Sequence, residues 1–365
     1  MTQAIAGPDR AASTARLEFG SAFTDHMVMS TWQADQGWQR LRLQPRGLLS
    51  VDPACVGLHY GQAVFEGLKA HRLDDGTVAA FRPAQHAHRM RISARRLSIP
   101  PLSAADFLQA VDLLVEADGP QLPADPTLSM YLRPLLVATE ANLALRPARE
   151  YTFVLQAFLT GGFFADQPDP VSVWISHDHV RAIPGGTGDV KYAGNYAPTY
   201  LAQAVAVEHG CQQVVWLDAV HRRWVEEMGG MNLFFVRGRG GDAEVLTPPL
   251  TGGLLPGVTR DTLLTLAARM GLNPREEPIS VDEWRSGCAE GRITEAFACG
   301  TGAGVTPVGV VKDGHSGWTI GDGRAGPVTL ALRNALLARQ YGRLPDPDGW
   351  LRRAAAPASA GDERA

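Results

Sequence analysis

Hydrophobic positions recur at helical spacing in two adjoining segments of the first half of the chain, residues 82–99 and 102–119. Pro83 suits the first turn of the first segment, and Ser103 with Asp106 forms an N-cap and its N3 partner in the second. We therefore predict two consecutive helices. Alternating or continuous apolar runs predict strands around them, at residues 77–81, 128–139 and 150–159.

The second half alternates short apolar runs with amphipathic segments. The runs predict strands at residues 171–176, 212–218, 222–228, 231–238, 243–247, 292–299 and 304–311. Helices are predicted at residues 197–210, 258–271 and 327–342, where Gly210 and Gly271 stand at helix C-caps. This mixture predicts an α/β (α+β) fold.

The length of 365 residues exceeds that of a usual single domain, so we expect two. Glycine, proline and aspartate concentrate at residues 160–170, between two strands, and mark the boundary. The predicted parts are a small N-terminal domain at 17–164, a linker and first strand at 165–185, and a large domain at 186–350. Residues 1–16 and 351–365 are Ala-rich and polar, which predicts a disordered N-terminus and a flexible tail.

Composition narrows the partner to a small molecule. The net charge is −4 with both signs interleaved, which argues against nucleic acid or a membrane surface. No apolar run reaches 18 residues, and the N-terminus lacks the apolar core of a signal peptide. The four cysteines are widely spaced, and His177 and His179 have no third ligand nearby, so we expect neither disulfides nor a metal but a cytoplasmic protein.

Lysine is rare in this chain. Of 34 basic residues, only Lys69, Lys191 and Lys312 are lysines. A lysine can lose its proton and attack a carbonyl, which a guanidinium cannot do. Lys191 lies in GDVKYAGNYAP among small and neutral residues, so it is the first candidate for such chemistry, although chance explains any one lysine equally well.

Two turns have the character of phosphate sites. The helix that begins at Val258 and Thr259 follows a Pro-Gly turn, and Thr301 lies in the glycine-rich turn ACGTGAGV. The simpler alternative for the first turn is an ordinary helix start capped by Thr259. Neither turn carries a dinucleotide or Walker A fingerprint, and the chain has no G-x-S-x-G nucleophile elbow.

Charged residues in apolar strands are the remaining candidates. Glu226 and Glu227 point to opposite faces if their strand is regular, so one looks inward, toward either a protonated ring nitrogen or an arginine. Tyr131 and Arg133 share a strand face and form either a carboxylate clamp or an edge ion pair. Arg89 is one of several arginines on its helix, which favours a solvated face.

These motifs together carry a resemblance. In order along the chain they are LHYGQAVFEGLKAHR, FRPAQHAHRMRISARRLSIP, YLRP, GGTGDVKYAGNYAP, VEEMGGMNLFF, LTPPLTGGLLPGVTRD and CGTGAGVTPV. From about Phe19 to Tyr341 the sequence resembles the branched-chain amino acid aminotransferases of bacterial type, which are fold type IV pyridoxal-phosphate enzymes. The resemblance implies a small N-terminal α/β domain, a larger C-terminal pseudo-barrel domain, and a homodimer with its active site at domain and subunit interfaces.

The resemblance also assigns residues. It makes Lys191 the catalytic Schiff-base lysine and proton carrier, and it selects Glu227 as partner of the pyridine nitrogen of pyridoxal 5′-phosphate. Tyr196 then holds the phenolic oxygen of the cofactor. Its phosphate falls to Arg89, Val258, Thr259 and Thr301. The substrate sites implied are Thr301, Gly302 and Ala303 with Tyr131 and Arg133 for the carboxylate, and Phe19, Phe65, Phe163 and, from the other subunit, Tyr60 and Leu145 for the side chain.

The implied reaction is reversible, ping-pong transfer of the amino group of L-leucine, L-isoleucine or L-valine to 2-oxoglutarate, with the preference among these amino acids left open. The chain departs from the family in two places. Gly230 stands where some relatives carry a hydroxyl residue, and the redox-active cysteine pair of animal relatives is missing, so we expect no thiol switch.

Three rival interpretations remain. A D-amino acid aminotransferase or an aminodeoxychorismate lyase of the same fold class would keep the lysine and the glutamate. A non-catalytic module could use the phosphate turns to bind an anion or a sugar phosphate. The LHYGQAVFEGLKAHR and YLRP stretches favour the branched-chain interpretation.

Overall fold

The computed structural model describes residues 17–161, 168–240, 243–314 and 316–354. The chain divides into two compact units, one made of the residues up to Gly161 with those from Arg339 onward, and one of Gly162–Ala338. The expected disordered N-terminus at 1–16, the residues 162–167 of the boundary region, Phe163 among them, and the tail from 355 lie outside the described residues. We describe each unit by itself.

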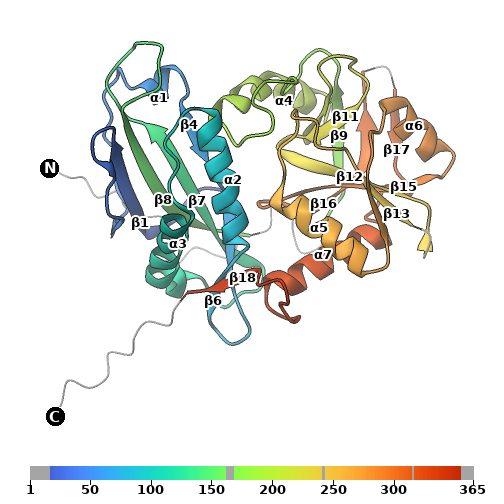
Figure 1. Cartoon of the computed structure of the whole chain (residues 1–365). Helices are drawn as coiled ribbons and strands as arrows, with labels where there is room; N and C mark the ends of the chain where they lie inside the picture. The colour runs from blue at the N-terminus through green and yellow to red at the C-terminus, as the bar shows by residue number, and fades with distance from the viewer. Residues whose placement is uncertain (1–16, 162–167, 241–242, 315, 355–365) are drawn as a thin grey trace. The chain divides into compact units, whose positions relative to one another are not determined.

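The first unit is built on a mixed-length antiparallel sheet (Figure 1). Its strands follow the order β18-β6-β5-β7-β8-β1-β2, while β3 pairs with β1 and β4 with β7. Their bounds are β1 Ala22–Gln33, β2 Gly37–Trp38, β3 Arg42–Pro45, β4 Ala63–Phe65, β5 Leu68–Arg72, β6 Val78–Phe81, β7 Leu128–Ala138, β8 Glu150–Gly161 and β18 Leu351–Arg353. The long hairpin of β7 and β8 pairs Leu128 with Gly161 at one end and Ala138 with Tyr151 at the other, and forms the centre of the sheet.

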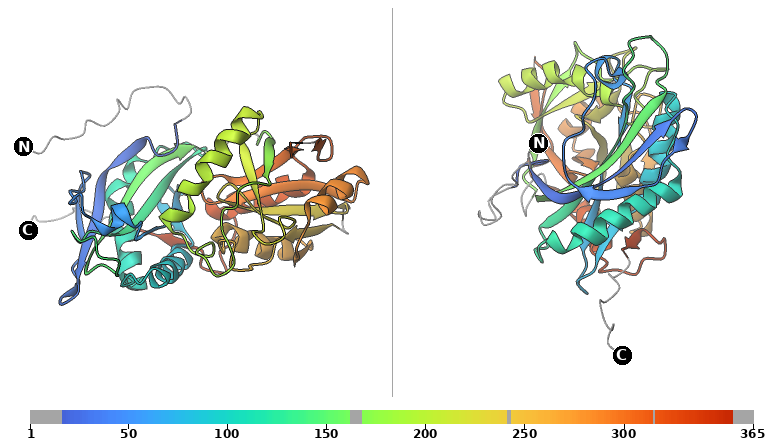
Figure 2. Two further views of the ribbon diagram at one scale, coloured as in Figure 1. Left: turned by 90° about the horizontal axis from the view of Figure 1, so that it is seen from above. Right: turned by 90° about the vertical axis from the view of Figure 1, so that its left-hand side faces the viewer.

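Two helices cover one face of this sheet, α2 (Pro83–Arg96) and α3 (Ala104–Asp118), and they lie side by side (Figure 2). Both match the predicted helices and their starts. Pro83 occupies the first turn of α2, and Ser103 Oγ accepts a hydrogen bond of 3.0 Å from the Asp106 amide at the start of α3. The short helices α1 (Val56–His59) and η1 (Gly119–Gln121) complete the unit.

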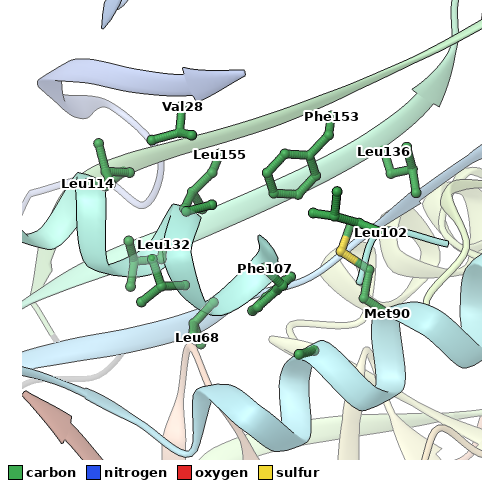
Figure 3. Close-up of a cluster of buried hydrophobic side chains, with 14 of the residues drawn as sticks. Val28, Leu68, Met90, Leu102, Phe107, Leu114, Leu132, Leu136, Phe153 and Leu155 are labelled. Atoms are coloured by element: carbon green, nitrogen blue, oxygen red, sulfur yellow. The ribbon is translucent and has the colours of Figure 1, made fainter. Parts of the chain in front are cut away.

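The core of the first unit lies between the helices and the sheet (Figure 3). Apolar side chains from α2 and α3 meet those of the central strands, and burial of each large side chain stabilises the fold by about 1.5–3 kcal/mol. The labelled members are Val28, Leu68, Met90, Leu102, Phe107, Leu114, Leu132, Leu136, Phe153 and Leu155.

The C-terminal segment, from Arg339 onward, belongs to the first unit. This differs from the expectation that the large domain continues to residue 350. The expectation of a flexible tail is also wrong for its first residues, because Leu351–Arg353 form β18 and pair with β6. Large aromatic groups account for this return. Tyr341 contacts the ring of His71 and donates a hydrogen bond of 2.6 Å to the Pro126 carbonyl, and the buried Trp350 ring packs against Phe81.

The second unit is a closed barrel with a side extension. Six strands form the ring in the order β11-β10-β9-β16-β15-β12, and pairing of β11 with β12 closes it. Strand β9 runs parallel to both β10 and β16, and the other pairs of the ring are antiparallel. The bounds are β9 Val171–Ser176, β10 Gln213–Leu217, β11 Val225–Met228, β12 Met231–Arg237, β15 Ile293–Gly300 and β16 Gly304–Lys312, with β13 Glu244–Thr247, β14 Asn273–Glu276 and β17 Gly317–Thr319 outside the ring.

Helices pack on the outside of these strands. They are α4 (Tyr200–Glu208), α5 (Val258–Arg269), α6 (Val281–Ala289) and α7 (Pro327–Gln340), with the 3₁₀ turns η2 (Ala193–Asn195) and η3 (Ala197–Thr199). The C-caps of α4 and α5 are His209 and Met270, one residue before the predicted positions, and Gly210 and Gly271 follow them with the left-handed φ of 68° and 74° that ends a helix. The mixed α/β content and the barrel confirm the expected fold class. Among the described residues, no helix combines the length and the apolar character needed to cross a membrane.

Candidate functional site

The loop after β9 carries the candidate lysine and is cross-linked by hydrogen bonds of one buried asparagine. The buried Asn195 side chain donates hydrogen bonds to the carbonyls of Thr187 (2.6 Å) and Val190 (3.0 Å) and accepts one from the Thr187 hydroxyl (2.7 Å). These bonds hold both ends of the turn that contains Lys191. The Lys191 amine lies 3.1 Å from the Tyr196 hydroxyl, so the structure brings these two predicted residues together.

Glu227, on β11, is only 2% exposed and is surrounded by donors. Its Oε1 accepts hydrogen bonds from the Leu255 amide at 2.9 Å and from the Asn232 side chain at 3.3 Å. Its Oε2 lies 3.0 Å from Nε of Arg181. A buried carboxylate with a guanidinium and two amide donors is stabilised in its charged form, as a partner of a cationic ring nitrogen must be.

Glu226 is buried as well, so the expectation that only one of the two glutamates looks inward is wrong. The strand is not regular: Trp216 pairs with Glu227 and Leu217 with Val225, so Glu226 is the extra residue of a β-bulge. A bulge breaks the alternation of side chains, and both carboxylates interact with the charge of Arg181. Burial raises the pKa of Glu226 to about 7, Arg181 opposes this and Glu227 adds to it, and among the described residues Oε2 has no hydrogen-bond partner.

Arg181 links the lysine loop to the glutamates, a role that the sequence did not reveal. Its Nη2 donates to the carbonyl of Gly253 at 2.5 Å and to that of Gly188 at 3.4 Å, and its Nε faces Glu227. The loops fit closely, because a Cβ on Gly188 would lie 2.4 Å from the Gly253 carbonyl oxygen. The surrounding sequence, SHDHVRAIPGG, is typical of a polar loop, and no signal there marks one arginine as central.

The first predicted phosphate turn lies next to Glu227. Helix α5 begins at Val258 and its N-cap is Gly257, so the alternative of Thr259 as the cap is wrong. Glycine offers no side-chain acceptor to the first-turn amides, and a Cβ there would lie 2.1 Å from the Asn232 Oδ1. Asn232 also donates to the Leu255 carbonyl at 3.0 Å. The same asparagine therefore fixes both Glu227 and the approach to the helix N-terminus, where an anion is favoured.

The second predicted phosphate turn is the tip of a hairpin. Gly300 and Gly304 pair across β15 and β16, so the loop between them consists of Thr301, Gly302 and Ala303. Gly304 has a φ of 67°, which favours glycine there. A short glycine-containing turn of this kind suits the expected binding of an anion.

Arg89 belongs to the first unit and does not lie on a solvated helix face, so that expectation is wrong. It is 7% exposed and pairs with the fully buried Glu66 through two bonds, Nε to Oε1 at 2.7 Å and Nη2 to Oε2 at 2.9 Å. His86 Nδ1 lies 2.7 Å from the same carboxylate, and the Gly67 amide donates to it at 3.1 Å. Burial alone would raise the pKa of Glu66, but the charge and hydrogen bonds of Arg89 and His86 outweigh it and hold that pKa well below its usual range.

Tyr131 and Arg133 gather with aromatic residues on one face of the first sheet. The rings of Tyr131 and Phe158 are stacked at 5.0 Å, and Phe19 meets both edge-on at 4.9 and 4.8 Å. The Arg133 guanidinium lies over the rings of Phe65 (5.0 Å) and Tyr131 (5.2 Å). The predicted side-chain and carboxylate residues Phe19, Phe65, Tyr131 and Arg133 are thus neighbours in the structure.

Two predicted pocket residues lie in exposed segments of the same unit, Tyr60 at the end of α1 and Leu145 in the loop between β7 and β8. Tyr60 is 45% exposed and its hydroxyl donates a hydrogen bond of 2.8 Å to the Leu143 carbonyl, while Leu145 is 88% exposed. Leucine side chains of this kind are costly to leave in water, so the loop has the character of a contact surface.

A cavity of about 340 Å³ opens elsewhere in the second unit, and none of its lining residues belongs to the predicted site. It is lined by Trp174, Ile175, Ser176, His177, Asp178, His179, Ala202, Val205, Asp313 and Gly314. Within the described ranges, no group of three or more His, Cys, Asp or Glu side chains is placed to hold a metal ion.

Comparison with known proteins gives a consistent result. The family described as Amino-transferase class IV matches residues 63–311. Branched-chain-amino-acid aminotransferase of Mycolicibacterium smegmatis is 50% identical over 336 residues, which cover 92% of this chain and 91% of that protein. Branched-chain-amino-acid transaminase 1 of Bacillus subtilis is 41% identical, with coverage of 92% and 93%.

Solved structures agree. The branched-chain amino acid aminotransferase of Escherichia coli superposes with a TM-score of 0.74 at 26% identity, and covers 91% of this chain and 100% of that one. A second solved branched-chain amino acid aminotransferase, in complex with pyridoxamine 5′-phosphate, gives a TM-score of 0.74 at 27% identity, with coverage of 91% and 99%.

Proposed function

Because this chain belongs to the branched-chain-amino-acid aminotransferases of the class IV amino-transferase family, we propose that it moves the amino group of L-leucine, L-isoleucine or L-valine reversibly to 2-oxoglutarate. The names of its relatives support the donor class. A relative of known structure contains pyridoxamine 5′-phosphate, which supports pyridoxal 5′-phosphate as the cofactor here.

The residues of the second unit fit this cofactor. Glu227 offers a buried carboxylate beside a guanidinium, as a protonated pyridine nitrogen requires. The glycine-capped start of α5 and the Thr301 turn suit a phosphate group, and we assign the phosphate to Arg89, Val258, Thr259 and Thr301. Tyr196 is assigned to the phenolic oxygen of the ring.

The observation that carries the proposal is the pair of Lys191 and Tyr196, 3.1 Å apart on a loop that Asn195 and Arg181 hold in place. Pyridoxal phosphate supplies an aldehyde that binds amines and a ring that takes up the electrons of the substrate α-carbon. Lys191 would hold that aldehyde through its amine, and the same amine would serve as the base that moves the proton at the substrate α-carbon. Tyr196 orients the lysine amine, and Glu227 holds a proton on the ring nitrogen.

The first unit supports the substrate part of the proposal. Tyr131 and Arg133 offer a hydroxyl and a cation for a carboxylate, with the amides of Thr301, Gly302 and Ala303 assigned to the same task. The rings of Phe19 and Phe65 lie beside Arg133, so one surface offers apolar contact for leucine and charge for glutamate. Phe163 is assigned to the same pocket from the sequence resemblance alone.

A homodimer and a cytoplasmic location are part of the proposal. Leu58, Leu143 and Leu145 are exposed around Tyr60, which supports a second copy of the chain as the cover of this loop, as the assignment of Tyr60 and Leu145 to the partner's pocket requires. The four cysteines are free, which is consistent with a reducing compartment.

The test is glutamate formation from L-leucine and 2-oxoglutarate by the purified full chain. Lys191→Ala should lower kcat by at least about 1000-fold, because it removes the covalent anchor and the base together. Tyr196→Phe should lower it about tenfold, the loss of one hydrogen bond to the reacting amine. Lys312→Ala is the matched control, since Lys312 contacts the His209 carbonyl outside the site and should keep its activity.

Other outcomes would favour a rival function. Turnover of D-alanine but not L-leucine would indicate a D-amino acid aminotransferase, and release of pyruvate from aminodeoxychorismate would indicate the lyase. A chain that binds neither pyridoxal phosphate nor amino acids would support the binding module.

A further inference from the structure

The first unit holds a buried group of polar residues in which only Arg89 has an assigned role. Glu66 joins β4 to β5 and is completely buried, with His86 and Arg89 facing it from α2. Both side chains of α2 are themselves at most 7% exposed. Placing a carboxylate here costs free energy unless its partners are well aligned, so the geometry of this group calls for an explanation.

The four contacts define one geometry. Oε1 of Glu66 accepts from Arg89 Nε, and Oε2 accepts from Arg89 Nη2, at 2.7 and 2.9 Å. Oε2 also faces His86 Nδ1 at 2.7 Å and the Gly67 amide at 3.1 Å. The carboxylate thus accepts two parallel hydrogen bonds from one edge of the guanidinium. This arrangement fixes the plane of the guanidinium as well as its position.

Fixing that edge has a consequence for the rest of the guanidinium. Arg has five N–H donors, and the bidentate pair commits two of them to Glu66, so the Nη1 side of the plane is directed away from the carboxylate. An arginine whose plane is already fixed in the folded protein loses less side-chain conformational entropy when it binds phosphate.

We infer that Glu66, supported by His86, is a positioning residue that aims Arg89 at the phosphate of the cofactor. The inference rests on the proposed function, in which Arg89 binds that phosphate. It differs from a stability role in one respect: the loss of Glu66 should weaken binding of pyridoxal phosphate and leave binding of pyridoxal, which lacks the phosphate, almost unchanged.

The experiment measures dissociation constants of pyridoxal 5′-phosphate and pyridoxal for the full chain after removal of cofactor, by equilibrium dialysis. For Glu66→Gln we expect binding of pyridoxal phosphate to weaken about tenfold and binding of pyridoxal to change less than about twofold. The first figure is taken by analogy from metal sites in other proteins, where removal of a carboxylate that orients a ligating side chain weakens binding by about this factor. Glu66→Asp keeps the charge but withdraws it by one methylene, so it should show the same selective loss. It decides the question if Glu66→Gln does not fold.

The matched control is Asp112→Asn. Asp112 forms the same bidentate pair with Arg352, at 2.7 and 2.6 Å, but near the surface of this unit. It should leave both dissociation constants unchanged.

Two outcomes would overturn the inference. If folded Glu66→Asp or Glu66→Gln protein keeps the wild-type ratio of the two constants, Glu66 does not aim Arg89, while the proposed function stands. If the wild-type chain binds pyridoxal phosphate no more tightly than pyridoxal, or if Arg89→Met keeps the wild-type ratio of the two constants, the assignment of Arg89 fails and the inference fails with it.

Discussion

This protein buries carboxylates at two sites, and the charged form is stabilised differently at each. In the first unit, a single carboxylate, that of Glu66, faces Arg89, His86 and a backbone amide, so both of its oxygens have hydrogen-bond partners. In the second unit, Glu226 and Glu227 share the charge of Arg181, while the Leu255 amide and the Asn232 side chain donate to Glu227. The pKa of Glu66 falls and that of Glu226 rises, although both side chains are buried.

The difference shows that burial alone does not determine the charge of a carboxyl group, because the neighbouring charges and hydrogen-bond donors can outweigh it. We call the Glu66 site saturated because both of its oxygens have donors; its carboxylate stays charged and can align a neighbouring cation. We call the site of Glu226 and Glu227 shared because both face the one cation of Arg181. There, Glu226 can take up a proton near neutral pH. Each experiment below changes one side of this comparison.

The largest effect is expected when the cation of the saturated site is removed. Arg89→Met leaves Glu66 charged and fully buried, with His86 and the Gly67 amide as its remaining partners among the described residues, so the free energy of unfolding should fall by about 3–5 kcal/mol. Urea denaturation at pH 7.5 measures it. Arg352→Met, which breaks the outer pair with Asp112, should cost less than about 1 kcal/mol.

A loss for Arg89→Met as small as that for Arg352→Met would contradict the comparison. It would mean that Glu66 takes up a proton as readily as Glu226 does, so that the two sites are electrostatically alike.

A smaller effect of opposite sign is expected at the shared site. Glu226→Gln removes an acid whose Oε2 has no hydrogen-bond partner among the described residues, so the variant should be more stable than wild type at pH 8.5, by about 1–3 kcal/mol. At pH 5 the two proteins should be nearly equal, because wild-type Glu226 is then protonated. Denaturation at a series of pH values measures the difference.

The sign follows from the direction of each pKa shift. The folded pKa of Glu226 lies above its ordinary value of 4.5, at about 7, so its favourable contribution is complete below 4.5 and is lost as pH rises through 7. The folded pKa of Glu66 is depressed, so its contribution is present above 4.5 and is lost as pH falls. Glu290→Gln, in the exposed pair with Arg292, is the control and should show no such trend. A gain for Glu226→Gln that stays constant with pH would refute the shared-site account.

The smallest effect is expected at Gly230, which lies beside Tyr196. A Cβ there would stand 3.6 Å from Cε1 of the tyrosine, an ordinary contact, so Gly230→Ser should change kcat/KM for L-leucine by no more than about twofold. Gly67→Ser is its counterpart in the first unit. That Cβ would lie 1.9 Å from the Tyr131 hydroxyl, so the tyrosine must move and kcat/KM should fall at least about tenfold. Equal effects would show that the second unit has no more room than the first.

Much of the fold could be predicted because local signals and packing agree. The helices α2, α3 and α5 begin and end near the predicted residues, since capping and apolar spacing are encoded locally. Strand β5 was not predicted, because Lys69 and His71 interrupt the apolar pattern; burial among the strands lowers the pKa of Lys69 to about 8. Helix α6 was not predicted because it is only nine residues long, although Ser280 caps the Glu283 amide at its start and Val281 and Trp284 form a short buried stripe.

In the candidate site, too, contacts between residues close in sequence could be predicted and contacts between distant residues could not. Lys191 and Tyr196 are five residues apart on one loop, so their meeting follows from local sequence. Arg181 and Glu66 act through partners that lie 46 and 23 positions away in sequence (227 − 181 and 89 − 66), and no local pattern encodes such pairs. The burial of both glutamates depends on a change of register between two strands, which is a property of the paired sheet and not of either strand alone.

That change of register also bears on how the chain tolerates loss of a residue. Leu217 pairs with Val225 and Trp216 with Glu227, so Glu226 has no cross-strand partner of its own on β10. A chain from which Glu226 was deleted could keep every other pairing of β10 with β11, and Glu227 would remain opposite Trp216. The adjacent glutamates are therefore not two copies of one function: the first is an insertion that the barrel accommodates, and the second is part of its framework.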